Sequence, residues 1–327
     1  MSLNTLSLIP LLALISFFSG QANSAILLVP SEHATIQLAV DAATNGDVVL
    51  VSPGTYAGTT NVFGKIITLR STDGPDLTIL DGNSAGTVIR FSTASAPGET
   101  TLEGFTVRNG SSTFGAGISL GGGSQTVIRG NVFSNNNQGS GGAGAAIDCN
   151  GCTSLVTQNV FSGNSCDSQF SSGVVSVVNA ATIEIRSNLF VDNPCRAVNI
   201  TAPSSARPSV LGNTMIGNAT GIYIDARTND NSAQILRHNL IAFNEIGLDV
   251  VFAFAPLNAQ FADNVLFGNT MQVAGGAGNP IGNLGNRNVD PLMIDPANGD
   301  YRLRADSSLI DAPIGAAGTP RIGANAI

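Results

Sequence analysis

Two carboxylates, a tyrosine and an arginine are spaced so that they could share one chemical task. Apolar and polar residues alternate from Gly221 to Arg227, and the polar ones include Tyr223 and Asp225. A strand with this alternation places its polar side chains on one face, with Arg227 near the following turn. If a neighbouring strand brings Asp249 beside Tyr223, the group would suit general acid–base catalysis or calcium-assisted handling of a uronate. The simpler interpretation, which we favour, is a solvated strand face.

A sixfold repeat determines which strands are neighbours. The motif is N-x-F-x-x-N with an apolar residue at its third position, and its first asparagines are Asn131, Asn159, Asn188, Asn213, Asn239 and Asn264. Consecutive copies begin 28, 29, 25, 26 and 25 residues apart, a period typical of solenoids. Short alternating runs broken by Gly and Asn indicate strands. We therefore expect an all-β, single-stranded parallel β-helix, with one coil per repeat and coils stacked ~4.8 Å apart.

The two asparagines of each copy are expected to be structural. Asparagine tolerates the left-handed backbone conformation that a sharp bend needs. Stacked in register, each side-chain amide can donate to the next along the solenoid axis and so form a ladder. The second ladder would contain Asn136, Asn164, Asn193, Asn218, Asn244 and Asn269. The residue between the two asparagines would point inward, so that Phe133, Phe161 and Phe190 stack on one another.

Alignment of the coils defines a candidate binding face. The coil before Tyr223 contributes Asn199 and Thr201 to the same face, and the coil after it contributes Asp249. Solenoids often bind ligands on such an outward face. The residues expected to line this groove are Asn199, Tyr223, Asp225, Arg227 and Asp249. We expect any catalysis, substrate binding or calcium binding to occur there.

Three arginines form a second candidate surface. Arg129, Arg186 and Arg237 each lie two residues before a first asparagine, in alternate coils. They would point outward ~10 Å apart and could contact an anionic polymer. Arginines on exposed strands also serve simply as solubilising residues, and we prefer that interpretation.

The net charge and the first residues of the chain narrow the classes of function and the location to expect. The chain of 327 residues has a net charge of −8 and one lysine, Lys65, which argues against nucleic acid and against general attraction to acidic polysaccharides. Residues Met1 to Ser24 have the apolar run and small residues of a secretory signal peptide. We expect a secreted or cell-surface protein without a membrane span after cleavage, monomeric, with one domain over residues 25–327.

The N-terminal part carries a family resemblance. Ala34 to Thr44 has apolar residues at helical spacing, and a strand and a turn follow. The stretch ATIQLAVDAATNGDVVLVSPGTY resembles the N-terminal cap and first strand of secreted right-handed parallel β-helix proteins of the pectin-lyase-like superfamily. The resemblance implies a right-handed helix, with a short capping α-helix and first coil in residues 25–60 and further coils in 61–275. Gly-rich stretches at 115–123 and 139–144 are expected to be loops.

The C-terminal part carries a second resemblance. Asn288 to Leu303 reads NVDPLMIDPANGDYRL, and an Ile-Asp and an Ile-Gly-Ala run follow. This order is similar to the C-terminal end of secreted β-helix proteins that carry interchangeable surface anchors. It implies a C-terminal cap segment over residues 276–327. Arg321 stands where such proteins have an acidic residue, so the last contact of this cap differs.

Known enzymes of this fold carry signatures that are missing here. The sequence lacks the Asn-Thr-Asp, Asp-Asp, Gly-His-Gly and Arg-Ile-Lys set of polygalacturonases and the arginine-proline-arginine pattern of pectate lyases. Their absence favours an exported protein that recognises a glycan or polysaccharide without turnover. The alternative is a polysaccharide-modifying enzyme, a lyase, glycoside hydrolase or epimerase.

Four cysteines in an exported chain suggest disulfides. Cys166 and Cys195 each lie seven residues after the first asparagine of their motif, so stacked coils would bring their Cα atoms within disulfide reach. Cys149 and Cys152 flank the turn dipeptide Asn-Gly. We predict the pairs Cys166–Cys195 and Cys149–Cys152, with four free thiols or another connectivity as alternatives. No metal site is expected, because no histidine lies near the Cys149/Cys152 pair.

Overall fold

The computed structural model describes residues 24–92, 98–167, 172–179, 181–201, 208–225, 234–251, 260–276 and 278–310. The expected signal peptide, except Ser24, and Arg227 and Arg321 lie outside these residues. Within the described ranges no helix is both long and apolar enough to cross a membrane.

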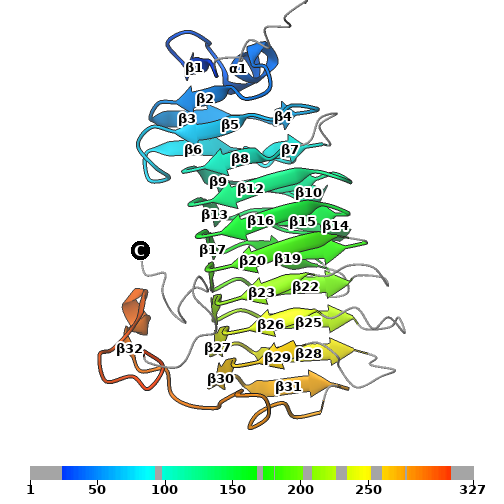
Figure 1. Ribbon diagram of the computed structural model, residues 1–327, viewed down its shortest axis with the longest axis vertical. Helices are drawn as coiled ribbons and strands as arrows, with labels where there is room; N and C mark the ends of the chain where they lie inside the picture. The colour runs from blue at the N-terminus through cyan, green and yellow to red at the C-terminus, as the bar shows by residue number, and fades with distance from the viewer. Residues whose placement is uncertain are drawn as a thin grey trace, which may run out of the picture.

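The described chain winds into a parallel β-helix with three long sheets, as predicted (Figure 1). Sheet A contains β1 (Ile26–Val29), β2 (Val48–Val51), β5 (Thr68–Ser71), β8 (Thr100–Glu103), β12 (Gln125–Arg129), β16 (Thr153–Thr157), β20 (Thr182–Arg186), β23 (Ser209–Leu211), β26 (Ile235–Arg237) and β29 (Gln260–Ala262). Sheet B contains β3 (Gly54–Ala57), β6 (Thr78–Asp81), β9 (Thr106–Arg108), β13 (Val132–Ser134), β17 (Val160–Ser162), β21 (Leu189–Val191), β24 (Thr214–Ile216), β27 (Leu240–Ala242) and β30 (Val265–Phe267). Sheet C contains β4 (Thr60–Val62), β7 (Ile89–Phe91), β11 (Ile118–Leu120), β15 (Ile147–Asn150), β19 (Gly173–Val178), β22 (Arg196–Thr201), β25 (Thr220–Asp225), β28 (Ile246–Val251) and β31 (Met271–Gly275).

A short fourth sheet occupies most of the Gly-rich stretch 139–144, which was expected to be a loop. Sheet D contains β10 (Ser111–Phe114), β14 (Asn137–Ala143) and β18 (Ser165–Cys166), between sheets B and C. The stretch 139–144 lies largely inside β14, so that expectation was wrong, whereas the stretch 115–123 contains only β11 and is otherwise outside strands, as expected. Pairing with adjacent coils forms these strands despite the low strand propensity of glycine.

Two asparagine ladders run through the coils. Asn159 illustrates the pattern: its Oδ1 accepts from the backbone N–H and the side-chain amide of Asn131, at 3.0 and 3.1 Å. Its Nδ2 donates to the carbonyl of Ile128 at 2.9 Å. The first ladder extends one coil beyond the repeat, to Asn286, and the second ends at Gln272. The predicted ladders are therefore confirmed.

The predicted backbone role of these asparagines was wrong. The left-handed conformation belongs to the residue before each asparagine, which is Gly130, Asn135, Gln158, Gly163, Ser187, Asp192, Gly212, Gly217, His238, Phe243, Asp263 or Gly268. The preceding residue makes the bend, and the asparagine that follows can then direct its amide along the axis. Asn is selected for its paired donor and acceptor, which a ladder consumes completely.

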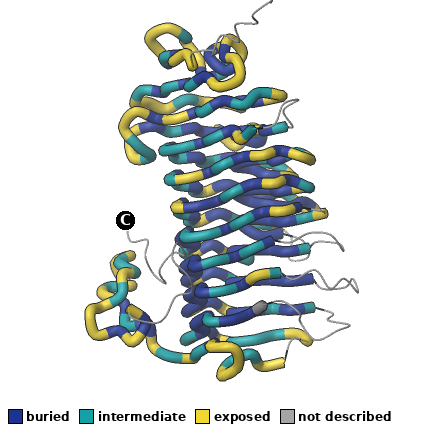
Figure 2. The backbone as a smooth tube through the Cα atoms, in the orientation of Figure 1, coloured by how far each residue is buried: buried dark blue, intermediate teal, exposed yellow. Residues whose placement is uncertain are grey.

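The core is one continuous apolar column inside the coils. Figure 2 shows that buried residues recur along the stacked coils. Stacked rings fill its centre, with centroids 4.8 Å apart for Phe133 and Phe161 and 4.6 Å apart for Phe161 and Phe190. These spacings equal the distance between adjacent strands, so the coil spacing itself sets the stacking. The predicted phenylalanine column is confirmed.

The N-terminal end of the core is covered by α1 (Ile36–Ala42), as expected. Ile36, Ala39 and Val40 are buried beneath it. Lys65 binds the C-terminal end of this helix, because its Nζ donates to the carbonyls of Val40, Asp41 and Ala43 at 2.6, 2.7 and 2.8 Å. The only lysine of the chain thus serves as a helix cap.

The C-terminal segment contributes an antiparallel hairpin, β32 (Met293–Asp295) and β33 (Asp300–Leu303), joined by the 3-10 turn Pro296–Asn298. Its apolar residues pack on the outer side of sheet B. That cluster comprises Ile216, Leu240, Ala242, Val265, Phe267, Val289, Met293, Tyr301, Leu303 and Leu309. Figure 1 shows β32 beside the solenoid, next to the last strands of sheet B.

Both predicted disulfides are present. Cys149 pairs with Cys152, with Cα atoms 5.4 Å apart, and Cys166 pairs with Cys195, with Cα atoms 5.7 Å apart. The second bond joins consecutive coils, as the repeat arithmetic predicted. No free cysteine remains.

Candidate functional site

Polar residues from successive coils form one row on the outer side of sheet C. The strand register pairs Asp148 with Ser176, Ser176 with Asn199, Asn199 with Tyr223 and Tyr223 with Asp249. The residues on either side of Tyr223, Ile222 and Ile224, lie in the core, so the row points away from it. We call these five positions the sheet-C row. The predicted neighbourhood of Asn199, Tyr223 and Asp249 is present.

The solvated strand face that we favoured is not what this row forms. Asn199 is fully buried, and Tyr223 and Asp225 are each only 6% exposed, whereas Asp249 is partly exposed. Part of the cover is Arg196, whose guanidinium lies 3.4 Å from the centroid of the Tyr223 ring. Strand alternation indicates the side on which a residue lies but not what covers that side. The row is a covered polar layer that opens at Asp249.

Arg196 is the basic residue of this site, and sequence reasoning missed it. Its Nη1 donates to Asn199 Oδ1 at 3.1 Å while its plane lies over Tyr223. Strict alternation would group Arg196 with the inward Val198. However, it is the first residue of β22, and its long side chain reaches the outer side. Arg227, which was predicted for this role, lies outside the described residues.

Burial and the positive charge of Arg196 determine the pKa shifts in this site. Desolvation lowers the pKa of Arg196, and the hydroxyl of Tyr223 and the carboxylates of Asp249 and Asp225 oppose that shift. Desolvation raises the pKa of Asp249, and Arg196 opposes the rise. A partly exposed carboxyl group with a raised pKa can take up or release a proton. At its open end the row therefore presents one carboxyl group, Asp249, that could accept a hydrogen bond or exchange a proton.

The far end of the row contains an isolated acid. Asp148 is 3% exposed, and its Oδ1 has no hydrogen-bond partner. Its register partners on sheet C are Ser119, just beyond the row, and Ser176, and burial raises its pKa to about 7. At neutral pH a group of this kind is divided between its neutral and charged forms.

The three predicted arginines do form one column on the outer side of sheet A. The register places Thr157 between Arg129 and Arg186, and Leu211 between Arg186 and Arg237. Arg129 pairs with Glu103 at 2.8 Å, and Arg186 lies 2.9 Å from Glu184. These glutamates neutralise much of the charge that an anionic polymer would need, and they favour the solubilising interpretation.

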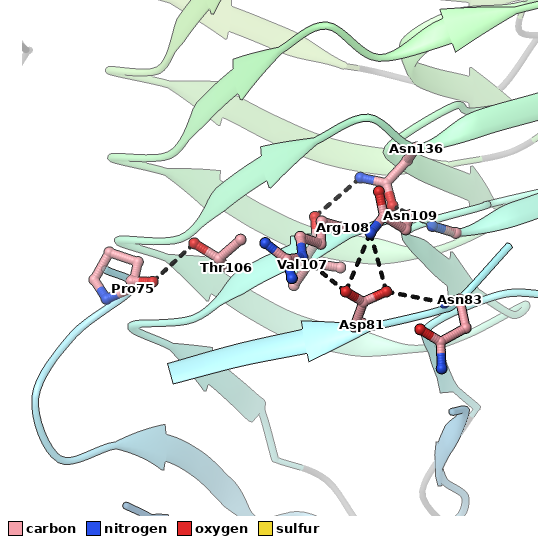
Figure 3. A network of polar contacts seen from close by, with 9 residues as sticks. Pro75, Asp81, Asn83, Thr106, Val107, Arg108, Asn109 and Asn136 are labelled. Atoms are coloured by element: carbon pink, nitrogen blue, oxygen red, sulfur yellow. Dashed lines mark hydrogen bonds and ion pairs between the residues drawn. The ribbon is translucent and has the colours of Figure 1, made fainter. Parts of the chain in front are cut away.

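A second polar cluster, on sheet B, has a structural role (Figure 3). Asp81 is 5% exposed and accepts from the Arg108 Nε at 2.8 Å, from the Asn109 amide at 3.1 Å and from the Asn83 backbone N–H at 3.0 Å. Burial raises the pKa of Asp81, but these hydrogen bonds outweigh it and leave the pKa below its usual value. A carboxylate whose oxygens are occupied in this way fixes neighbouring coils.

Comparison with known proteins gives three findings. Residues 145–287 match the family described as periplasmic copper-binding protein (NosD). No curated protein matches the sequence. Among solved structures, an alginate lyase from Paenibacillus sp. is 12% identical with a TM-score of 0.46, covering 77% of this chain and 98% of the lyase. A pectin methylesterase from Aspergillus niger is 12% identical with a TM-score of 0.43, covering 84% of this chain and 92% of the esterase. The chain is a parallel β-helix whose coils between residues 145 and 287 match the NosD family.

Proposed function

We propose that this protein acts outside the cytoplasm and recognises a polysaccharide through sheet C, at β22, β25 and β28. The observation that carries the proposal is the convergence of Arg196, Asn199, Tyr223 and Asp249 from three consecutive coils. The buried Asn199 and Tyr223 hold Arg196 in place, and the partly exposed Arg196 and Asp249 offer a donor and an acceptor in a fixed arrangement, which suits recognition of sugar hydroxyl groups.

The proposed location rests on three features. The two disulfides suit an oxidising compartment outside the cytoplasm. The first residues, Met1 to Ser24, read as a secretory signal. The family that residues 145–287 match is described as periplasmic.

Copper binding, which the name of that family mentions, is not supported by the side chains available here. All four cysteines form disulfides, so no thiolate is left as a ligand. Nowhere in the described ranges do three His, Cys, Asp or Glu side chains gather as a metal site would require.

Enzymatic modification of the polysaccharide is the second candidate, favoured by one observation. Asp249 is paired with Tyr223, is partly exposed and has a pKa raised by desolvation. Proton transfer by this pair would support a lyase or hydrolase reaction. Release of reducing ends or of products with unsaturated absorbance would favour this candidate, and their absence with a retained polymer would favour recognition alone.

Affinity electrophoresis tests recognition directly. The purified protein would migrate through gels containing polygalacturonate, alginate or hydroxyethylcellulose. We expect retardation on at least one polymer, and we expect Asp249→Asn to weaken that affinity about tenfold, because a hydrogen bond to a charged group is lost. Asp76→Asn makes the same chemical change at an exposed position far from sheet C and should leave the affinity unchanged. Unretarded wild-type protein on all three polymers would refute the proposal.

A further inference from the structure

Strand β31 forms the last edge of sheet C, at the end of the solenoid opposite α1 (Figure 1). Its Met271 N–H donates to the carbonyl of Glu245 in the preceding coil at 2.9 Å. Backbone groups of successive residues in a strand point to opposite edges, so those of Gln272 and Ala274 point away from β28. β31 therefore carries backbone donors and acceptors on an edge that faces out of the stack.

The segment that follows β31 continues sheet B and not sheet C. Arg287 donates its N–H to the carbonyl of Asn264 at 2.8 Å and accepts from the N–H of Leu266 at 2.9 Å, beside β30. Ile281 packs against the end of the core. Within the described ranges, no backbone hydrogen bond reaches the outer edge of β31. This edge therefore keeps the geometry that can pair with one more strand.

The opposite end of the solenoid shows how this chain protects a strand that ends a sheet. In β1 the N–H of Leu28 donates to the Glu32 carboxylate at 3.1 Å, and its carbonyl accepts from the N–H groups of Glu32 and His33 at 3.1 and 3.0 Å. A charged side chain and a turn thus occupy that edge, which protects it against pairing with another chain. The sequence around β31 offers no equivalent, because residues 264–286 contain no Asp, Glu, Lys, Arg or His.

We propose that the outer edge of β31 is a self-association surface, where β31 pairs antiparallel with β31 of a second copy across a two-fold axis. A two-fold contact uses the same patch on both copies, and an antiparallel pair of identical strands has that symmetry. Pairing satisfies the backbone groups of Gln272 and Ala274 and covers Met271, whose side chain is 50% exposed. The proposal is independent of polysaccharide recognition, and it replaces the monomer that was expected from sequence.

The distribution of charge favours a second copy as the partner. Each copy has a net charge of −8, so two copies repel one another over most of their surface. β31 itself is uncharged, and the carboxylates of Glu245 and Asp249 lie one strand back. Three strand spacings would separate each from its equivalent in the other copy, ~14 Å, which exceeds the Debye length of ~8 Å at physiological ionic strength. Two copies can therefore meet at this end without close like-charge contacts.

Size-exclusion chromatography with light scattering tests the proposal on the purified protein. The mass of the wild type should rise from one chain toward two as the concentration increases from about 1 to about 100 µM. Ala274→Lys adds a charge to an outward, partly exposed side chain and should raise the dissociation constant at least about tenfold, with an unchanged circular dichroism spectrum. Ala57→Lys makes the same change at an exposed position in β3 and should leave association unchanged.

Hydrogen exchange in the wild type identifies the surface without any substitution. The amides of Gln272 and Ala274 should exchange about tenfold more slowly at the high concentration than at the low one. A dimer in which these amides exchange equally at both concentrations would place the contact elsewhere and overturn the proposal. Loss of association in Leu38→Lys, at a 52% exposed position of α1, would show head-to-tail stacking and overturn it as well. Wild-type protein with the mass of one chain at about 100 µM would refute self-association.

Discussion

Asp148 should make the stability of this protein depend on pH, and its replacement by asparagine isolates the effect. The carboxyl group is 3% exposed, and its Oδ1 has no partner. In the other direction along sheet C, the strand register leads from Asp148 through Ser119 to the exposed Arg90, at ~10 Å. Nothing along the row therefore compensates the charged form.

The magnitude follows from the pKa, which burial raises from 3.8 to about 7. A folded-state pKa above the unfolded value means that the folded state holds its proton more tightly. The contribution of protonated Asp148 to the free energy of unfolding is fully present below about pH 4 and is lost as the pH rises through about 7. At ~1.4 kcal/mol per pKa unit, the loss approaches about 4 kcal/mol as an upper limit. Asp148→Asn keeps the shape and cannot ionise, so it removes this pH-dependent loss.

Urea denaturation followed by far-ultraviolet circular dichroism would measure the effect. The difference in unfolding free energy between Asp148→Asn and wild type should be near zero at about pH 4 and favour the variant by a few kcal/mol at about pH 8. Asp306→Asn, at an exposed ion pair with Arg304, is the matched control and should show less than about 0.5 kcal/mol at both pH values. A difference for Asp148→Asn that is equal at the two pH values would refute the reasoning.

Three further predictions concern the scaffold. Asn188→Ala should lower the free energy of unfolding by about 3 kcal/mol, because two donors of Asn159 and the carbonyl of Val156 lose their partner. Asn298→Ala, in an exposed turn, should change it little, and equal effects of the two variants in thermal or urea unfolding would contradict the ladder. Lys65→Met should destabilise the α1 cap by about 2 kcal/mol, because the helix end loses its three hydrogen bonds from Lys65. Amide hydrogen exchange in α1 should become faster, and unchanged exchange would show that these three hydrogen bonds do not stabilise the cap. Replacing both Cys166 and Cys195 by alanine opens a loop spanning 29 residues and should cost about 3.5 kcal/mol in urea unfolding; no change in the midpoint would argue against the bond.

The fold could be predicted from sequence because its determinants repeat. Each N-x-F-x-x-N copy specifies an inward residue and two axial amides, so six copies define the stack without knowledge of other contacts. The bend residue varies between Gly, Asn, Gln, Ser, His, Asp and Phe, because any residue held at a positive φ angle suffices. Because this position varies, its role in the bend was not recognised from sequence, and the left-handed conformation was assigned to the repeated asparagine instead.

The candidate site could be predicted only in part, for two physical reasons. Asn199, Tyr223 and Asp249 follow their motif asparagines at nearly equal distance and so align, whereas β14 and β18 lie between the motif and sheet C ahead of Asp148 and Ser176. Counting from the motif therefore misplaces those two residues. Burial was the second obstacle, because a period of two residues cannot reveal that Arg196 lies over Tyr223.

The direction of the ladder hydrogen bonds indicates in which order the coils could fold if the chain is exported with its N-terminus first. A newly arriving coil brings the Oδ1 that accepts from the preceding asparagine and the Nδ2 that donates to a carbonyl of the preceding coil, as Asn159 does for Asn131 and Ile128. Each coil is thus completed by the residues that emerge immediately after it. A chain threaded across a membrane with its N-terminus leading could add coils one at a time onto the α1-capped end, without waiting for any distant segment.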